Sequence, residues 1–243
     1  MHPQPKFLNA GDMALVVELG DAIRPDINQR VHDLRRAIEK RAVAGVVDLV
    51  PTYRSLLVYY DPLRTTDAAL RQEIAALEAG LAGVSLSPTR IVEIPTTYGG
   101  EFGPDLGFVS EHTGLPADEV IRIHSGTDYL VYMMGFTAGF PYLGGMSSRI
   151  ATPRLKTPRT RIPAGSVGIA QEQTGIYPTD SPGGWQIIGR SPVRIFDAER
   201  DPPVVIEAGD YIRFVPVGMD TYREVERQVL AGTYVLRTQS RQD

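Results

Sequence analysis

The sequence contains no cysteine among its 243 residues. This absence excludes a thiol nucleophile, a disulfide framework and any metal site built on thiolates, and it leaves the redox compartment undecided. No stretch approaches the roughly 20 consecutive apolar residues that a membrane-spanning helix needs. The first twenty residues also lack the basic segment and apolar run that mark a secretion signal. By elimination, we expect a cytoplasmic protein.

An excess of positive charge is also missing. The chain has 25 Lys and Arg against 29 Asp and Glu, which gives a formal net charge of -4. The whole molecule would therefore not be drawn onto nucleic acid. The hydrophobic fraction of 42% and the charged fraction of 22% are typical of a globular chain that folds. Its length allows one large domain or two ordinary ones, each with its own core.

Strand-like and helix-like patterns alternate over residues 1–95. The predicted elements are, in order, a strand over 13–19, a helix from Pro25, strands over 45–50 and 54–60, a second helix, and a strand over 90–94. In each helix apolar residues recur at intervals of three and four, which predicts one buried face: Ile27, Val31, Leu34 and Ile38 in the first, and Leu70, Ile74, Leu77 and Leu81 in the second. The order βαββαβ predicts a ferredoxin-like α+β domain.

The pattern changes in the Pro/Gly-rich stretch over 95–105, so we place a second domain over 96–243. Short helices are expected near 105–113 and 116–124. Beyond them, short apolar runs separated by Gly and Pro turns favour an antiparallel β-barrel or sandwich; the runs are YLVYMMG, GSVGIA, WQIIG, VRIF, VVI and YIRFVPV. A capping box from Thr221 to Glu224 predicts a C-terminal helix that ends at Gly232.

Three motifs with known chemistry do not fit their surroundings. AGSVG (164–168) is one residue away from the nucleophile elbow, but the glycines and prolines that follow exclude the helix an elbow requires. Ser166 is interpreted as a turn residue near a site. His112 and His124 lack metal-site spacing and are interpreted as surface or capping residues. No glycine turn precedes Lys156, which excludes a Walker-type loop but not other nucleotide sites.

The stretch GFTAGFPYLGG (135–145) supplies the first candidate site residues. Glycines of this density let the backbone approach a ligand closely, and Phe140 and Tyr142 would form rigid apolar walls. The alternative is a glycine-rich corner of a barrel, where a bend needs no side chain.

The stretch RLKTPRTRIPAGSV (154–167) supplies the second. Arg154, Arg159 and Arg161 stand between prolines that would stiffen their presentation, and a planar guanidinium suits a carboxylate or a phosphate. The alternative is a solvated basic loop.

The third stretch, QTGIYPTDSPGGWQIIGR (173–190), contains the only tryptophan, Trp185. Gln173, Tyr177 and Gln186 accompany it among four glycines and two prolines. Amides and aromatic rings on a stiff backbone suit either a small polar ligand or a protein interface.

Together these three stretches resemble the KipI family, whose members are also described as the B subunit of the bacterial ATP-dependent 5-oxoprolinase or as allophanate hydrolase subunit 1. VPTYRSLLVYYDP (50–62) and NAGDMALVVELG (9–20) are similar to that family too, so the resemblance covers residues 7–217. Two residues depart from the family pattern: Ala138 stands where a proline is common, and Gln171 where a glycine is.

The resemblance implies a ferredoxin-like N-terminal domain and a cyclophilin-like β-barrel. It also implies partners in a hetero-oligomer: a C subunit, which is KipA-like and similar to biotin-dependent carboxyltransferases, and a separate A subunit of the LamB/YcsF type. The assembled enzyme would use ATP, with Mg²⁺, to open the lactam of 5-oxoproline to L-glutamate. Whether this chain binds the nucleotide itself is left open.

The chemistry assigns hypothetical roles to the candidate residues. A lactam is poorly attacked by water, and phosphorylation of its oxygen would make its carbon electrophilic, so the site needs cations and a grip on a carboxylate. Arg159 and Arg161 would act in catalysis, with Asp180 as the nearest candidate base. The expected substrate-binding residues are Phe140, Tyr142, Arg154, Ser166, Gln173, Thr174, Tyr177, Trp185 and Gln186.

Two other functions fit the same resemblance. Similar barrels form the carboxyltransferase region of urea carboxylase, in which case the chain would process urea-like amides or allophanate with biotin. Some family members are described as inhibitors of a sensor histidine kinase, in which case SPGGW would belong to a protein interface.

Overall fold

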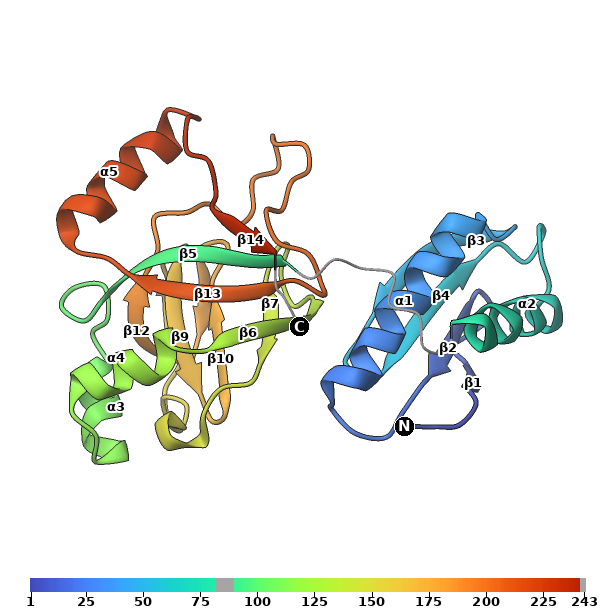
Figure 1. Cartoon of the computed structure of the whole chain (residues 1–243), viewed down its shortest axis with the longest axis horizontal. Helices are drawn as coiled ribbons and strands as arrows, with labels where there is room; N and C mark the ends of the chain where they lie inside the picture. The colour runs from blue at the N-terminus through green and yellow to red at the C-terminus, as the bar shows by residue number, and fades with distance from the viewer. Residues whose placement is uncertain (82–89, 241–243) are drawn as a thin grey trace. The chain divides into compact units, whose positions relative to one another are not determined.

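The computed structural model describes residues 1–81 and 90–240. The chain divides into two compact units, Met1–Pro88 and Thr89–Asp243 (Figure 1). Each unit has its own hydrophobic core. Both units mix helices and strands, so the fold belongs to the α+β class. No helix in the described part of the chain is long and apolar enough to cross a membrane.

The first unit is an antiparallel sheet packed against two helices. Its elements are β1 (Lys6–Asn9), β2 (Ala14–Glu18), α1 (Pro25–Arg41), β3 (Val46–Pro51), β4 (Ser55–Tyr60) and α2 (Asp67–Gly80). The strand order is β1-β2-β4-β3. Apolar residues of β2 and β4 form one core with those of both helices. The buried face predicted for the first helix is confirmed, since Ile27, Val31, Leu34 and Ile38 of α1 are all buried.

The βαββαβ order predicted for this unit is wrong. The strand expected over 90–94 is part of β5 (Arg90–Tyr98), which pairs with β13 (Tyr211–Pro216), β12 (Gln186–Arg190) and β14 (Thr238–Ser240) in the second unit. The edge beside β2 is occupied instead by β1, in antiparallel pairing. An apolar run shows that a segment is a buried strand, but not which sheet it joins, because the partner lies far away in sequence.

The second unit is a curled sheet with helices at its periphery. It begins with β5 and continues with α3 (Leu106–Thr113), α4 (Ala117–Ser125), β6 (Asp128–Met134), β7 (Pro141–Gly144), a 3₁₀ turn (Ser148–Ile150), β8 (Arg159–Ile162), β9 (Ser166–Ala170), β10 (Gln173–Ile176), β11 (Ser181–Gly183), β12, β13, α5 (Met219–Leu230) and β14. Helices α3 and α4 confirm the prediction for this region. The strand order is β10-β9-β12-β5-β13-β6-β7, and β14 also pairs with β5.

Strands β7 and β10, at the two ends of this order, lie against each other, so the sheet forms a nearly closed barrel. The expected barrel is present, but it is not wholly antiparallel, because β5 and β13 run parallel. The two runs VRIF and VVI do not form strands; they meet only in one isolated bridge, between Phe196 and Val204. Strands β8 and β11 form a separate two-stranded ribbon.

Helix α5 begins at Met219, and its N-cap, Gly218, lies three residues before the predicted N-cap Thr221. Thr221 therefore lies inside the first turn and does not cap the helix. The helix ends at Leu230, and Gly232 follows with a φ of 69°. A Thr-x-x-Glu pattern is equally compatible with the first turn of a helix, where an acidic side chain is favoured by the macrodipole.

Candidate functional site

Arg161, in β8, and Asp180, directly before β11, lie together. Arg161 Nε donates a hydrogen bond to Asp180 Oδ2 at 2.8 Å, and the backbone N–H of Ala164 donates to Asp180 Oδ1 at 2.8 Å. The Ala164 amide first, and Arg161 second, hold the pKa of the Asp180 carboxyl below its usual value. A carboxylate with a lowered pKa is a weak proton acceptor at neutral pH, so this geometry does not favour Asp180 as a general base.

Arg159 is held by an acidic residue that the sequence analysis missed. Its Nη2 lies 2.7 Å from Asp105 Oδ1, and its Nη1 donates to the carbonyl of Trp185 at 3.4 Å. The other oxygen of the buried Asp105 accepts the backbone N–H of Ile187 at 2.6 Å. Asp105 stands at the N-cap of α3, as its place before a helix suggests, but its side chain makes no cap hydrogen bond. It ties α3, β12 and Arg159 together instead.

The aromatic residues predicted as walls do come together. The ring centroid of Phe140 lies 5.6 Å from that of Tyr142, 5.6 Å from that of Tyr177 and 5.9 Å from that of Trp185, all edge to face. Phe140 and Tyr177 are buried, whereas Tyr142 and Trp185 are half-buried and can contact a ligand. Edge-to-face packing of this kind stabilises a cluster beyond its area burial.

Tyr177 also lies within the field of two of the predicted cations. Burial raises the pKa of its phenol to about 12, and the positive charges of Arg154 and Arg159 oppose this rise. The hydroxyl therefore stays protonated at neutral pH and can donate a hydrogen bond. This links the aromatic cluster to the arginines of the 154–167 stretch.

Thr174 does not face the predicted site but lies in the barrel core with His124. Thr174 Oγ1 lies 2.7 Å from His124 Nε2 and donates to the carbonyl of Gly168 at 3.1 Å. Because the threonine hydrogen is used there, Nε2 must carry the imidazole proton and donate it to Oγ1. His124 Nδ1 then accepts from the hydroxyl of Tyr98 at 2.8 Å. The hydrogen bonds alone thus define the tautomer.

The interpretation of His124 as a surface or capping residue is wrong. Its side chain is fully buried, and burial lowers its pKa to about 3, so the ring is neutral. Its partners Tyr98 and Thr174 lie in other elements, so no local pattern around residue 124 reveals them. His112 is exposed, as expected. Within residues 1–81 and 90–240, no group of three or more His, Asp or Glu side chains is arranged to hold a metal ion.

The other residues predicted for the site include Gln186, Gln173 and Ser166, which lie at the starts of three barrel strands. Gln186 is buried and donates from Nε2 to the carbonyl of Pro153 at 2.9 Å, so it fixes the loop before β8. Gln173 is half-buried at the start of β10. Ser166 begins β9, and a strand rather than a helix follows it, which confirms that no nucleophile elbow is present there.

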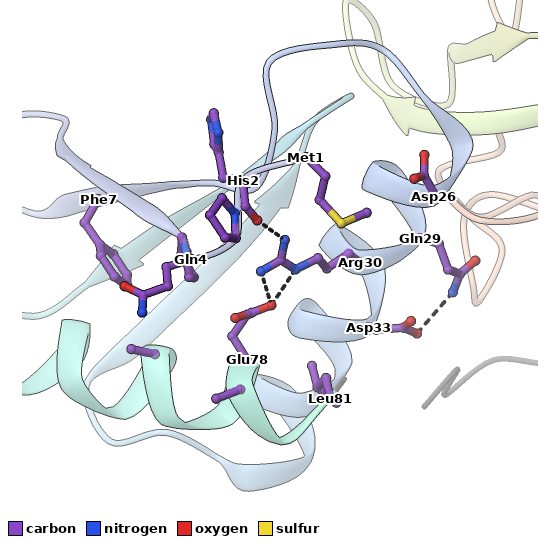
Figure 2. Close-up of a pocket in the computed structure, with 14 residues that line it drawn as sticks. Met1, His2, Gln4, Phe7, Asp26, Gln29, Arg30, Asp33, Glu78 and Leu81 are labelled. Carbon is purple, nitrogen blue, oxygen red and sulfur yellow. Dashed lines mark hydrogen bonds and ion pairs between the residues drawn. The ribbon is translucent and has the colours of Figure 1, made fainter. Parts of the chain in front are cut away.

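A separate cavity of about 910 Å³ opens in the first unit, between the N-terminal segment, α1 and α2 (Figure 2). Its central arginine, Arg30, forms an ion pair with Glu78 and donates to the carbonyl of His2 at 2.7 Å. None of the residues predicted for the site lines this cavity. We therefore place the candidate site in the second unit.

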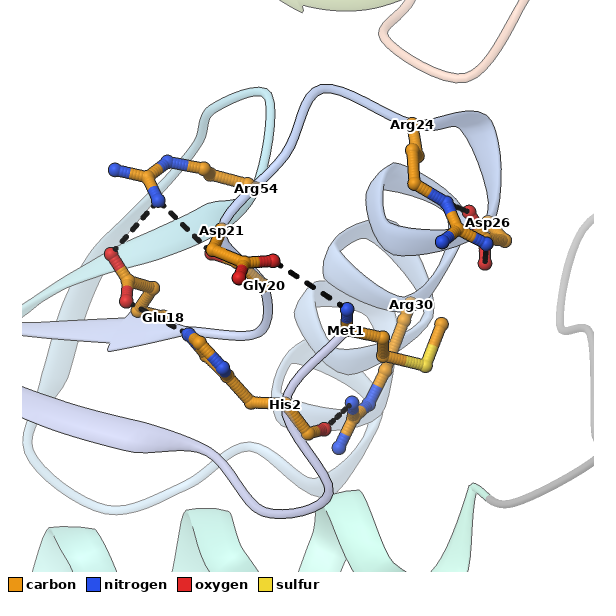
Figure 3. Close-up of polar contacts among 9 residues, drawn as sticks. All are labelled: Met1, His2, Glu18, Gly20, Asp21, Arg24, Asp26, Arg30 and Arg54. Atoms are coloured by element: carbon orange, nitrogen blue, oxygen red, sulfur yellow. Dashed lines mark hydrogen bonds and ion pairs between the residues drawn. The ribbon is translucent and has the colours of Figure 1, made fainter.

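Polar contacts fix the N-terminal segment beside this cavity (Figure 3). His2 Nε2 lies 2.9 Å from Glu18 Oε1, and Arg54 lies 3.4 Å from the other oxygen of Glu18. The hydrogen bond with His2, together with the charge of Arg54, lowers the pKa of Glu18 despite the opposing effect of burial. The backbone N–H of His2 also donates to the carbonyl of Leu19 at 2.9 Å. These contacts hold the N-terminal segment against the end of β2.

Comparison with known proteins gives a consistent picture. Residues 5–206 match the family model of the carboxyltransferase domain, subdomains C and D. The chain is 41% identical to the B subunit of 5-oxoprolinase from Bacillus subtilis, over 90% of this chain and 95% of that protein. It is 38% identical to the B subunit of the Escherichia coli O157:H7 enzyme, over 85% of this chain and 93% of that protein. It is 24% identical to urea amidolyase of Saccharomyces cerevisiae, of which it spans only 14%.

Solved structures share the fold. A conserved uncharacterized protein of Pyrococcus horikoshii is 49% identical, with a TM-score of 0.53 over 89% of this chain and all of that one. The protein TTHA0988 is 35% identical, with a TM-score of 0.75 over 84% of this chain and 40% of that one. The urea amidolyase of K. lactis, at 20% identity and a TM-score of 0.75, shows the fold alone.

Proposed function

Because the chain belongs to the family of carboxyltransferase domains, subdomains C and D, and is similar over most of its length to several B subunits of 5-oxoprolinases, we propose that it is the B subunit of an ATP-dependent 5-oxoprolinase. The observation that carries the proposal is that the similarity to the Bacillus subtilis and Escherichia coli B subunits covers almost the whole of this chain and of each relative. The name of these relatives indicates a multi-subunit enzyme, so the chain works as part of a complex.

We further propose the composition of that complex. Its other members are a KipA-like C subunit, similar to biotin-dependent carboxyltransferases, and a LamB/YcsF-like A subunit. The assembly consumes ATP with Mg²⁺, and we assign it to the cytoplasm, where ATP is supplied. In the same proposal the barrel is cyclophilin-like, and the first unit is a ferredoxin-like sheet in which β1 replaces the last strand.

The proposed reaction needs an anion-binding surface with a fixed cation. The γ-phosphoryl group of ATP passes to the lactam oxygen and ADP leaves. Water then adds to the activated carbon and the ring C–N bond breaks, which leaves the acyl phosphate of glutamate. A second water hydrolyses this acyl phosphate to L-glutamate and phosphate. Asp105 holds the guanidinium of Arg159 beside Trp185, so the remaining N–H groups of Arg159 are oriented without further ordering when an anion binds. Tyr142 and Trp185 would contact the ring.

The test is glutamate release from 5-oxoproline and ATP by this protein mixed with its C and A partners, with each component omitted in turn. Glutamate should form only in the full mixture. Substituting Arg159→Gln should lower the rate by about a hundredfold, if one charge-assisted contact to the transition state is lost. Full activity of this variant would contradict the role of Arg159, and no glutamate despite a stable complex would favour amide carboxylation or binding to a kinase.

A second candidate function is carboxylation of a urea-like amide. Its support is the name of the matched family model, a carboxyltransferase domain, together with the distant similarity to urea amidolyase. In that case the chain would act with a carboxybiotin-carrying partner, and labelled bicarbonate would enter the product. Label found in the product of the assembled complex would replace the first proposal by this one.

A further inference from the structure

A small chamber lies beside Arg159 and has a volume of about 80 Å³. Neither Tyr142 nor Trp185 of the aromatic cluster lines it. Its walls come from the loop before α3 and from β8, β9 and β12, and the residues that line it are Glu101, Phe102, Pro104, Arg159, Ile162, Pro163, Ser166, Ile187 and Arg190. None of the roles assigned so far includes Arg190 or this space.

Close backbone packing builds the chamber. Gly103 lies against β12 so tightly that a Cβ atom would come within 2.1 Å of the carbonyl oxygen of Ile188. Gly165, with a φ of 79°, would place a Cβ within 2.1 Å of the carbonyl oxygen of Ser191. Only glycine allows these two approaches, which bring the loop and the strands together around the space. Ser166 and Arg190 are directly paired across β9 and β12.

The remaining walls are apolar and fixed. Ile162 and Ile187 are buried. The ring of Phe102 stacks on Tyr222 of α5, with the centroids 4.7 Å apart. Apolar walls lower the local dielectric, which strengthens the interactions of charges beside them.

Two guanidinium groups border the space. Arg159 is oriented by Asp105, as described above. Arg190 donates from Nε to the carbonyl of Ala164 at 3.0 Å. Among the described residues, no carboxylate forms an ion pair with Arg190, so its terminal nitrogens keep their donors for another partner. Glu101, the acidic member of the lining, is exposed to solvent.

Ser166 adds a third donor. The residue is 2% exposed, and its hydroxyl makes no hydrogen bond to any side chain or carbonyl in the described part of the chain. The hydroxyl is therefore available to a group that enters the chamber. Arg159, Arg190 and Ser166 thus offer donors that together match an anion with several oxygens.

We propose that this chamber binds a small oxyanion, either a phosphate or a carboxylate group, between Arg159, Arg190 and Ser166. The size of the space selects the ligand. One water molecule needs roughly 10–15 Å³ in such a cavity, so about 80 Å³ holds a group the size of several waters. Ligands of nucleotide size need pockets of several hundred Å³. The chamber therefore takes a single oxyanion group and not ATP.

The identity of the natural anion rests on the proposed function. In that reaction the carboxylate of 5-oxoproline and the phosphate released from ATP are the two oxyanions small enough to enter. Either would place Arg190 in the binding machinery, beside the cation already fixed by Asp105. Since the whole nucleotide does not fit, its main contacts would be made by another part of the complex.

The experiment is isothermal titration calorimetry of the full chain with sodium phosphate and, separately, with 5-oxoproline, at constant ionic strength. At least one of the two should bind. Arg190→Gln should weaken that binding by about tenfold or more, because a charge-assisted contact is lost, and Ser166→Ala should weaken it by a smaller factor. Arg223→Gln is the matched control, since it removes the same charge from an exposed position on α5.

The possible results distinguish phosphate from 5-oxoproline as the bound anion, and they test the chamber separately from the proposed function. Competition between phosphate and 5-oxoproline would show one shared chamber, and binding of only one would identify the anion. Absence of binding of both up to about 50 mM overturns the proposal, as does equal affinity of Arg190→Gln and the unaltered protein. If Arg190→Gln shows no thermal unfolding transition, the variant is not folded. The affinity of Ser166→Ala for the same anion then tests the proposal in its place. Glutamate release is measured independently, so failure of the chamber and failure of the oxoprolinase assignment remain distinguishable.

Discussion

His124 makes folding of the second unit sensitive to acid. In the folded protein its pKa is about 3, whereas the ordinary value is 6.5, so between these values the unfolded chain binds a proton that the folded chain does not. Stability is then complete above about pH 6.5 and falls as the pH drops toward 3, by roughly 1.4 kcal/mol per pH unit. We expect His124→Gln to reduce this slope in urea unfolding measured between about pH 5 and 6.5.

The control for this prediction is His112→Gln, which removes an exposed imidazole from α3 of the same unit. It serves as the comparison because its side chain is exposed, whereas that of His124 is buried. An unchanged slope for His124→Gln would show that the ring binds its proton equally in the folded and the unfolded chain. The tautomer and the hydrogen bonds to Tyr98 and Thr174 would then need revision.

At the same scale, the contacts that were not predicted share one physical cause. Asp105 and Arg159 are 54 positions apart, and His124 and Thr174 are 50 apart. Residue type shows that a buried carboxylate or imidazole will need a partner, but not which one. The aromatic cluster was predictable because its four rings stand in Gly/Pro-rich segments, where chain bends can bring distant residues together. A polar pair requires two particular side chains to meet at hydrogen-bonding distance and angle, which chain bends alone do not determine.

At the scale of elements, the turn between β9 and β10 is strained. Ala170 pairs with Gln173, which leaves a two-residue loop, and its first residue, Gln171, has a φ of 55°. This is the left-handed region, which costs a residue with a Cβ about 1–2 kcal/mol, while glycine adopts it freely. The position is the one at which a glycine is common in the family that the sequence resembles.

We therefore expect Gln171→Gly to raise the free energy of unfolding by about 0.5–1 kcal/mol, after subtraction of the extra chain entropy of glycine. The same change two residues later, Gln173→Gly, falls within β10 and should lower it by a similar amount. Guanidinium unfolding at fixed pH measures both. A loss of stability in both variants would mean that contacts of the Gln171 side chain outweigh the backbone strain.

Helices and strands were predictable where apolar residues recur at the period of the element and thereby mark its buried face. The intervals of three and four located α1 and α2, and strand-like runs located β2, β3, β4, β6, β9, β12 and β13. Pairing partners were not predictable from the same runs, which is why residues 90–94 were assigned to the first sheet. Short strands such as β8 and β11, with four and three residues, contain too few positions for a period to show.

At the scale of the whole molecule, the two hydrophobic cores share no residue. Each unit should therefore have its own unfolding transition. Leu34→Ala, in the core of the first unit, should cost that unit about 2–5 kcal/mol, and Leu143→Ala should do the same in the second. Differential scanning calorimetry should show one transition moving in each variant and the other unchanged. Equal movement of both would demonstrate a single cooperative unit.

Strand β14 gives the second unit a further property. Ser240, near the end of the described chain, is paired with Arg90, where the described part of the barrel begins. The polypeptide thus enters and leaves the barrel at neighbouring points. A module with adjacent ends can be spliced into a longer polypeptide without rearranging its interior.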